Sequence, residues 1–125
     1  AAIVLSAEDV LFEALDEEAV RSVQPDFAAL RLLPARGVIV TSRSASPDYD
    51  FVSRFFAPAV GVDEDPVTGS SHTVLVPYWA KKLGKSEFTA HQASARGGVL
   101  RLRLAGDRVK IAGRAVTVIK GELVA

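Results

Sequence analysis

A helix-length apolar segment near the middle of the chain is the feature that most constrains its fold. Residues 70–83 carry apolar side chains on nearly every face of the first three helical turns, and Gly84 follows as a stop signal. A helix that is apolar all round is usually enclosed by other elements. Pro77 lies inside it, removes the backbone hydrogen bond to Thr73 and should bend the axis. We therefore expect a central helix wrapped by strands.

The residues directly before this helix are polar and favour an anion site. The free N–H groups and positive dipole end of a helix N-terminus can bind a carboxylate or a phosphate. Gly69 leaves room for a ligand to approach the backbone, and Ser70 and Ser71 add hydroxyl donors. This pattern predicts a small-anion site at the start of the helix.

The same residues also fit an ordinary capped helix. Asp65 or Thr68 can accept a hydrogen bond from the free N–H groups, and Pro66 suits a first helical position. In that case the polar side chains satisfy only the backbone. From the spacing alone, both interpretations stay open.

The rest of the chain predicts short strands with two short helices. Asp16 is a suitable N-cap for a helix over residues 16–23, and a second short helix is expected over 26–33. Gly106-Asp107 suits a tight hairpin turn. Consecutive short strands favour an α+β fold with an antiparallel or mixed sheet over a doubly wound parallel sheet. The expected strands are 3–5, 37–41, 49–56, 87–92, 99–104, 108–111 and 115–119.

Two groups of basic residues have alternative interpretations. Arg54 can bind a substrate carboxylate or pair with Asp50, and we favour the pairing. The basic side chains of the predicted hairpin can form a stripe, but this face offers no stacking aromatics for nucleic acid. We expect a solvated surface there, formed by Arg101, Arg103, Arg108 and Lys110.

Composition narrows the function further. The 125 residues suit one domain, and 15 basic residues balance 15 acidic ones, so no net charge points to nucleic acid or an anionic membrane. With no cysteine, the chain has no disulfide, thiolate metal site or thiol nucleophile. His72 and His91 stand alone in sequence and predict no metal site. Residues 1–5 are apolar but too short for a signal peptide, and no segment is long enough to span a membrane.

Several ordered motifs resemble the phenazine-biosynthesis-like isomerase family. The strongest is Glu-Asp-Pro-Val-Thr-Gly-Ser over residues 64–70, with Arg-Phe-Phe-Ala-Pro before it and Pro-Tyr-Trp after it. The likeness continues through 83–85, 92–98, 107–109 and 121–123, so it covers about residues 37 to 125. It is especially close to the branch of phenazine-biosynthesis-like domain proteins.

The resemblance implies a fold and an activity. Family members have the diaminopimelate-epimerase-like fold, with two similar domains and an active site in the cleft between them. Residues 1–125 would form a single domain equivalent to the C-terminal one, with an antiparallel or mixed sheet wrapped around a central helix. The implied reaction is cofactor-independent acid–base proton transfer on a small carboxylate-bearing substrate. The resemblance, with no signal peptide in sight, also leads us to expect a cytoplasmic protein.

Site residues carry over through the motif. Asp65 matches the aspartate that handles protons or orients the substrate, and Ser70 matches the catalytic-site serine. Ser70, with Thr68, Gly69 and Ser71, would bind the substrate carboxylate. The family's principal base is a glutamate of the other domain, and no acid of this chain matches its motif. His72 is attractive as a proton carrier, but we favour a packed polar side chain.

The isolated chain leaves a second function open. Half of an interdomain site can still bind a carboxylate, so a non-catalytic anion-binding or protein-interaction module is the alternative to an isomerase. The expected partners are a small carboxylate substrate and either the missing N-terminal domain or a second copy in a homodimer. Neither nucleic acid nor a membrane is an expected partner.

Overall fold

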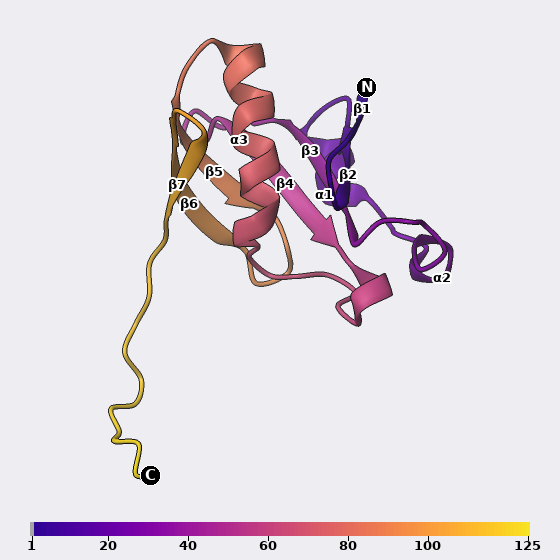
Figure 1. The fold of residues 1–125 in the computed structure, drawn as a ribbon. Helices are drawn as coiled ribbons and strands as arrows, with labels where there is room; N and C mark the ends of the chain where they lie inside the picture. Colours follow the sequence, from indigo (N-terminus) through magenta and orange to yellow (C-terminus); the bar gives the residue numbers. More distant parts are fainter. Residues whose placement is uncertain (1) are drawn as a thin grey trace.

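A computed structural model describes residues 2–125 as one curved sheet with helices on both faces (Figure 1). In chain order the elements are β1 (Ala2–Leu5), β2 (Asp9–Glu13), α1 (Glu17–Ser22), α2 (Phe27–Leu30), β3 (Gly37–Arg43), β4 (Phe51–Phe56), a short 3₁₀ turn (Pro58–Val60), α3 (Gly69–Leu83), β5 (Glu87–Gln92), β6 (Gly98–Ala105) and β7 (Arg108–Ala112).

The sheet is mixed, and its strands lie side by side in sequence order. Only β2/β3 and β4/β5 are parallel pairs, and each of these is joined by a helical crossover. Because β3 and β4 are antiparallel, the second crossover starts from a strand that points the opposite way. Right-handed crossovers therefore place α1 and α2 on one face and α3 on the other. The predicted α+β class with an antiparallel or mixed sheet is confirmed.

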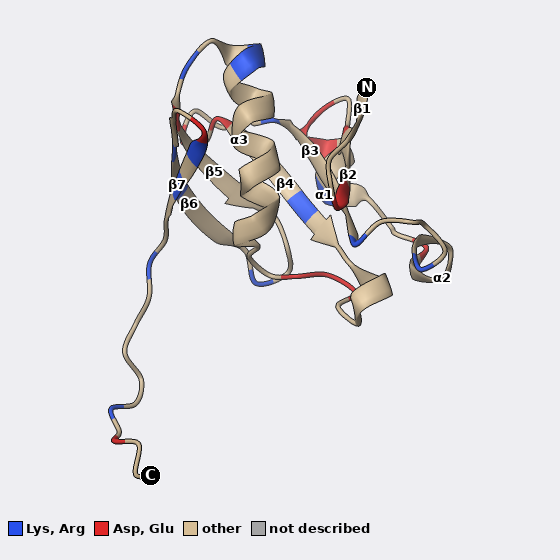
Figure 2. Ribbon diagram, in the orientation of Figure 1, with Lys and Arg blue, Asp and Glu red and all other residues tan. Residues whose placement is uncertain are grey.

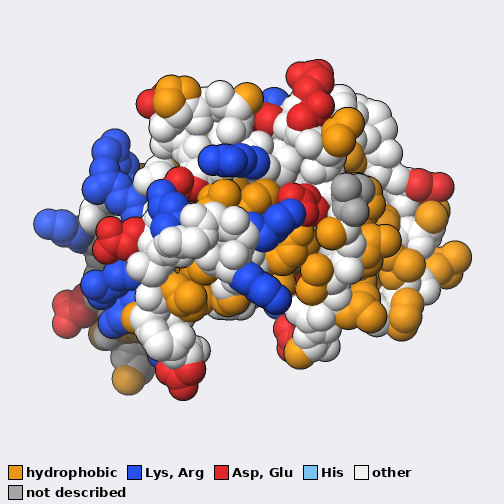
Figure 3. Space-filling model, turned by 90° about the horizontal axis from the view of Figure 1, so that it is seen from above, with side chains coloured by type: hydrophobic (Ala, Val, Ile, Leu, Met, Phe, Trp, Pro, Cys, Tyr) orange, Lys and Arg blue, Asp and Glu red, His pale blue; other side chains and the backbone are white. Residues whose placement is uncertain are grey.

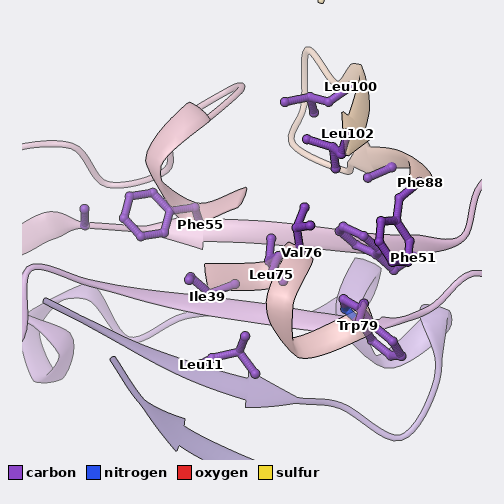
Figure 4. Packing of buried hydrophobic residues seen from close by; sticks show 12 residues of the cluster. Leu11, Ile39, Phe51, Phe55, Leu75, Val76, Trp79, Phe88, Leu100 and Leu102 are labelled. Carbon is purple, nitrogen blue, oxygen red and sulfur yellow. The ribbon is translucent and has the colours of Figure 1, made fainter. Parts of the chain in front are cut away.

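The main core lies between α3 and the concave face of the sheet (Figure 4). Leu75, Val76 and Trp79 of α3 are buried against side chains from the central strands. Val4 of β1 and Val109 of β7 also pack against this cluster, although these strands are the two edges of the sheet. The sheet must curve around α3 for both edges to reach the same cluster.

A smaller core covers the opposite face of β3 and β4. Phe51 and Phe55 of β4 face α3, whereas Val52 and Phe56 point to α1 and α2, as the two-residue period of a strand requires. Val20 of α1 is fully buried there. The short helices therefore seal the second face only near the middle of the sheet.

Helix α3 is enclosed on its sheet side only. Trp79 is 2% exposed, stacks on Phe51 and donates its indole N–H to Thr41 Oγ1 at 3.1 Å. An outer stripe of α3 stays exposed, so the expected all-round enclosure is not reached within residues 2–125. The stripe comprises Gly69, Ser70, Thr73, Pro77 and Lys81.

Two predicted elements differ in the structure. The second short helix ends at Leu30 rather than Leu33. Leu32 beyond it is 85% exposed, so burial of that side chain does not stabilise a further turn. The expected strand over 115–119 is wrong. Residues 113–125 run away from the sheet without a neighbouring strand (Figure 1), and Val116 and Val118 are each 85% exposed.

The surface carries both charge and apolar groups. The predicted basic stripe is confirmed as exposed side chains on β6 and β7. Seen from above, basic side chains gather on one side and apolar side chains on the other, the side on which Figure 1 places β1 and β2 (Figure 3). The large apolar side chains exposed within residues 2–15 are Ile3, Leu5, Phe12 and Leu15.

Candidate functional site

The N-terminus of α3 is open. The helix begins at Gly69, so Pro66 lies ahead of it and not at the first helical position. Thr68 is the N-cap residue, but its side chain makes no capping hydrogen bond. In such a helix, the N–H groups of the first residues have no partner within the helix. The N–H groups of Gly69, Ser70 and Ser71 are therefore available to an anion.

Asp65 stands beside this helix end. The Thr68 hydroxyl donates to Asp65 Oδ2 at 2.7 Å, and the Asp65 N–H donates to the Phe55 carbonyl at 3.0 Å. These two bonds hold the half-buried carboxylate at the entry to α3.

Acidic residues lie along the loop before α3, where the ribbon is red in Figure 2. The other two acids of this loop are paired with arginines. Asp63 accepts from Arg31 at 3.1 Å, and Glu64 accepts from Arg54 at 2.8 and 3.0 Å. Within the described residues, Asp65 has no such basic partner. It is the acid of the three that has no arginine beside it and is therefore free to face a ligand.

Arg54 has a structural role that differs from the expected pairing with Asp50. Besides Glu64, its guanidinium donates to the last carbonyls around α1, those of Val20, Arg21 and Val23 at 3.3, 3.1 and 2.9 Å. Asp50 instead accepts from Lys85 at 2.7 Å and from the Thr89 N–H at 2.8 Å. The pairing with Asp50 is wrong because Glu64 reaches Arg54 from the facing loop.

Gln92 fixes the loop before α3 through hydrogen bonds of its side chain. The sequence did not single it out as a site residue. Its side chain is fully buried and contacts Thr68 and Asp65 through three hydrogen bonds. Ser94 adds a bond to the Pro66 carbonyl at 2.8 Å. The available signal was a glutamine at the end of an otherwise buried strand pattern, where a polar side chain needs partners.

Gly98 lets the β5–β6 turn approach this loop closely. A Cβ atom at Gly98 would lie 2.2 Å from Cγ2 of Val67, far inside contact distance. The loop therefore depends on a glycine some thirty positions later in the chain, beyond reach of local patterns.

His72 is a packed side chain, as expected. It is fully buried, stacks on Phe51 with ring centroids 6.2 Å apart, and its Nδ1 lies 2.6 Å from the Thr68 carbonyl. Since a carbonyl only accepts, Nδ1 carries the proton and Nε2 is bare. Nε2 is buried without a hydrogen-bond partner. Burial lowers the pKa of His72, so the ring is neutral near pH 7 and lies out of reach of a ligand at the surface.

The predicted site residues divide into two kinds. Gly69 and Ser70 are exposed on the first turn of α3, where a ligand can reach them. Thr68 and Ser71 are buried, and the Ser71 hydroxyl donates to the Thr68 carbonyl at 3.0 Å. The side chains of these two residues serve the local structure, so they can act on a ligand only through the backbone.

An open groove reaches the same helix end. Its volume is 1180 Å³, and its walls come from Gly69, the β5–β6 turn at Arg96–Gly98, the start of β6, and Gly113 and Arg114. The C-terminal segment 113–125 therefore leaves the sheet beside the candidate site (Figure 1).

Two further observations concern metals and membranes. Within residues 2–125 no three His, Asp or Glu side chains gather as a metal site, and none of the helices there has the length and apolar character to cross a bilayer.

Comparison with known proteins identifies relatives of this chain. The model of the family described as phenazine biosynthesis-like protein matches residues 1–121. An uncharacterized isomerase of Pseudomonas aeruginosa is 61% identical over 121 residues, which make up 96% of this chain and 46% of the relative. Phenazine biosynthesis-like domain-containing protein 2 of Mus musculus is 54% identical over 95 residues, which make up 72% of this chain and 33% of the relative.

Solved structures agree with the sequence relatives. The crystal structure of a phenazine biosynthesis protein of the PhzF family from Enterococcus faecalis matches with a TM-score of 0.88 and 43% identity, over 98% of this chain and 46% of that one. The chain thus spans about half the length of the relatives it matches. It belongs to the family of phenazine biosynthesis-like proteins.

Proposed function

We propose that this chain supplies one half of the active site of a cofactor-independent isomerase that moves a proton on a small carboxylate-bearing substrate. The observation that carries the proposal is an uncapped helix N-terminus together with Asp65, an aspartate without a basic partner that lies three residues before the N-cap residue Thr68. The names of its relatives, uncharacterized isomerases, support this reaction class.

The two parts of the site would divide the work. The N–H groups of Gly69, Ser70 and Ser71, with the Ser70 hydroxyl, bind the substrate carboxylate at the positive end of α3. Asp65 holds or returns the proton at the neighbouring carbon, or orients the substrate for that step. The principal base comes from outside this chain.

A second polypeptide half completes the site in this proposal. Residues 113–125 expose an apolar, extended segment beside the groove, where Leu123 is 101% and Ile119 84% exposed. The structural match covers 98% of the chain, so most of this segment aligns with a protein about twice as long. Such a segment suits burial against the other domain of a diaminopimelate-epimerase-like pair, or against a second copy. We place the protein in the cytoplasm.

Carboxylate binding can be tested on the chain itself. In an NMR titration of ¹⁵N-labelled protein with sodium acetate at constant ionic strength, we expect saturable shifts of the Gly69, Ser70 and Ser71 amides. The amide of Ala19 serves as an internal control, because Asp16 caps it at 2.8 Å. Equal shifts with sodium chloride would overturn a carboxylate site.

Proton transfer needs the completed protein. With the other half supplied, we expect deuterium from D₂O to enter substrate at the carbon beside the carboxylate. Asp65→Asn should abolish that exchange while acetate binding persists, and Asp63→Asn, at an exposed ion pair, should leave it unchanged. Native mass spectrometry decides which partner is present.

The alternative function remains a binding module. Two Asp65 sites facing one another in a homodimer lack the family's glutamate. A homodimer that binds acetate and shows no deuterium exchange with any carboxylate would therefore favour an anion-binding or protein-interaction module over an isomerase.

A further inference from the structure

Gln92 is the buried centre of the loop that carries the site. Its carbonyl oxygen accepts from the Thr68 N–H at 2.8 Å. Its amide nitrogen donates to the Asp65 carbonyl at 2.8 Å and to Thr68 Oγ1 at 3.0 Å. A flipped amide would set donor against donor and acceptor against acceptor, so these partners fix one orientation.

The bonds of Gln92 also set the direction of the Thr68 hydroxyl. A hydroxyl has a single proton, and that of Thr68 goes to Asp65 Oδ2 at 2.7 Å. Its oxygen accepts the proton of Gln92 Nε2. A chain of donors therefore runs from Gln92 through Thr68 to the carboxylate and holds that carboxylate at the mouth of the helix.

The same bonds explain why α3 has no side-chain cap. A threonine at this position ordinarily accepts a hydrogen bond from the N–H two or three residues later. Asp16 and Asp26 make this bond for α1 and α2, at 2.8 and 3.0 Å. Thr68 does not make this bond; its hydroxyl is directed by its bonds to Asp65 and Gln92 instead.

We propose that Gln92 is a positioning residue that keeps the anion site of α3 open by holding Thr68 away from its own helix. It acts through Thr68 and touches no ligand. The inference rests on the proposed function for its consequence, carboxylate binding, but the uncapped state itself has a separate readout.

The first test is Gln92→Met, which keeps the length and apolar volume of the side chain and removes its hydrogen bonds. Freed from Gln92, Thr68 should turn to cap α3, so amide hydrogen exchange at Ser70 and Ser71 should slow. Acetate affinity should fall about fivefold, because the ligand then competes with a threonine cap. Unchanged exchange would overturn the proposal.

The decisive control adds Thr68→Val to Gln92→Met. The valine cannot cap, so exchange at Ser70 and Ser71 should return to the original rate and acetate affinity should recover most of the loss. The Thr68→Val single variant completes the double-mutant cycle. If Gln92 only stabilised the loop, the double variant would bind acetate no better than Gln92→Met, and the proposal would fail.

A second variant guards against misfolding of the first. Gln92→Glu keeps an acceptor for the Thr68 N–H, but its ionised carboxylate cannot donate to Thr68 Oγ1, so α3 should become capped and the exchange should slow as in Gln92→Met. Exchange that stays fast in Gln92→Glu would contradict the mechanism. If acetate shifts no α3 amide even in the unmodified chain, the proposed function fails, while the exchange contrast still tests Gln92.

Discussion

The N-terminal ends of α1 and α3 show two ways to finish a helix. Asp16 caps α1 with its own side chain, and two glutamates occupy the first turn, where the dipole favours them. α3 has neither a side-chain cap nor an acid in its first turn. The loop before α3 is instead fixed by hydrogen bonds with the side chains of Gln92 and Ser94. A helix end fixed by distant residues keeps its own N–H groups free for a ligand.

Arg54 joins the two regions, so its loss should have the largest effect on stability. It bonds the carbonyl end of α1 and pairs with Glu64 in the loop before α3. Arg54→Met leaves Glu64 without its partner in a half-buried position. We expect a loss of about 2–4 kcal/mol, since hydrogen bonds to charged groups contribute about 1.5–3 kcal/mol each.

Chemical denaturation followed by tryptophan fluorescence measures this loss. Trp79 is the single tryptophan and is buried in the main core between α3 and the sheet, so its emission reports unfolding. Arg31→Met, which removes an exposed ion pair with Asp63, is the matched control and should cost under about 0.5 kcal/mol. Similar losses for both variants would contradict a joining role for Arg54.

Gly98→Ala should disturb the end of α3 and spare α1. The new Cβ would lie 2.2 Å from Val67 Cγ2, and a β-branched side chain has little freedom to move aside. We expect a loss of about 1–3 kcal/mol from overpacking. Gly69→Ala is the control, because a Cβ there meets nothing within 4 Å. NMR shift changes in the variant should centre on Val67 and Thr68, and changes spread into α1 would count against this account.

The two helix ends also show how much the sequence can predict. The Asp16 cap, the Gly84 stop and the Gly106-Asp107 turn depend on residues a few positions apart, and all three were predicted correctly. Gln92 and the Arg54–Glu64 pair were missed because they depend on the parallel β4/β5 pairing and on the path of a loop. The strand expected at 115–119 has a suitable pattern, but no strand within residues 2–125 lies beside it. Local sequence patterns therefore predict a helix end that is capped by its own neighbours better than one that is held by residues far away in the sequence.

His72 should make the α3 region sensitive to pH. Burial lowers the pKa of His72 in the folded chain below the ordinary 6.5. Below pH 6.5 the His72 side chain therefore binds a proton more readily in the unfolded chain than in the folded chain. Stability should therefore fall as pH drops from 7 to 5, by at most about 1.4 kcal/mol per pH unit. His72→Asn, which keeps a donor for the Thr68 carbonyl, should flatten this dependence.

His91 is the matched control for this pH dependence. It is only half-buried, and burial followed by the nearby Arg21 lowers its pKa too. His91→Asn should therefore change the slope of stability against pH less than His72→Asn does. Equal slopes for both variants would show that the burial of His72 is not the cause.

The smallest effect, and the most direct test of the comparison, comes from removing the cap of α1. Asp16→Ala should cost about 1 kcal/mol and speed amide exchange at Ala19, whose N–H then has no acceptor. Thr68→Ala removes the corresponding residue of α3, yet exchange at Ser71 should stay the same, because no cap is lost there. Its cost should appear instead at Asp65 and Gln92, whose hydrogen bonds to the hydroxyl disappear. Faster exchange at Ser71 in that variant would mean that Thr68 caps α3 in solution and that its N-terminus is closed to a ligand.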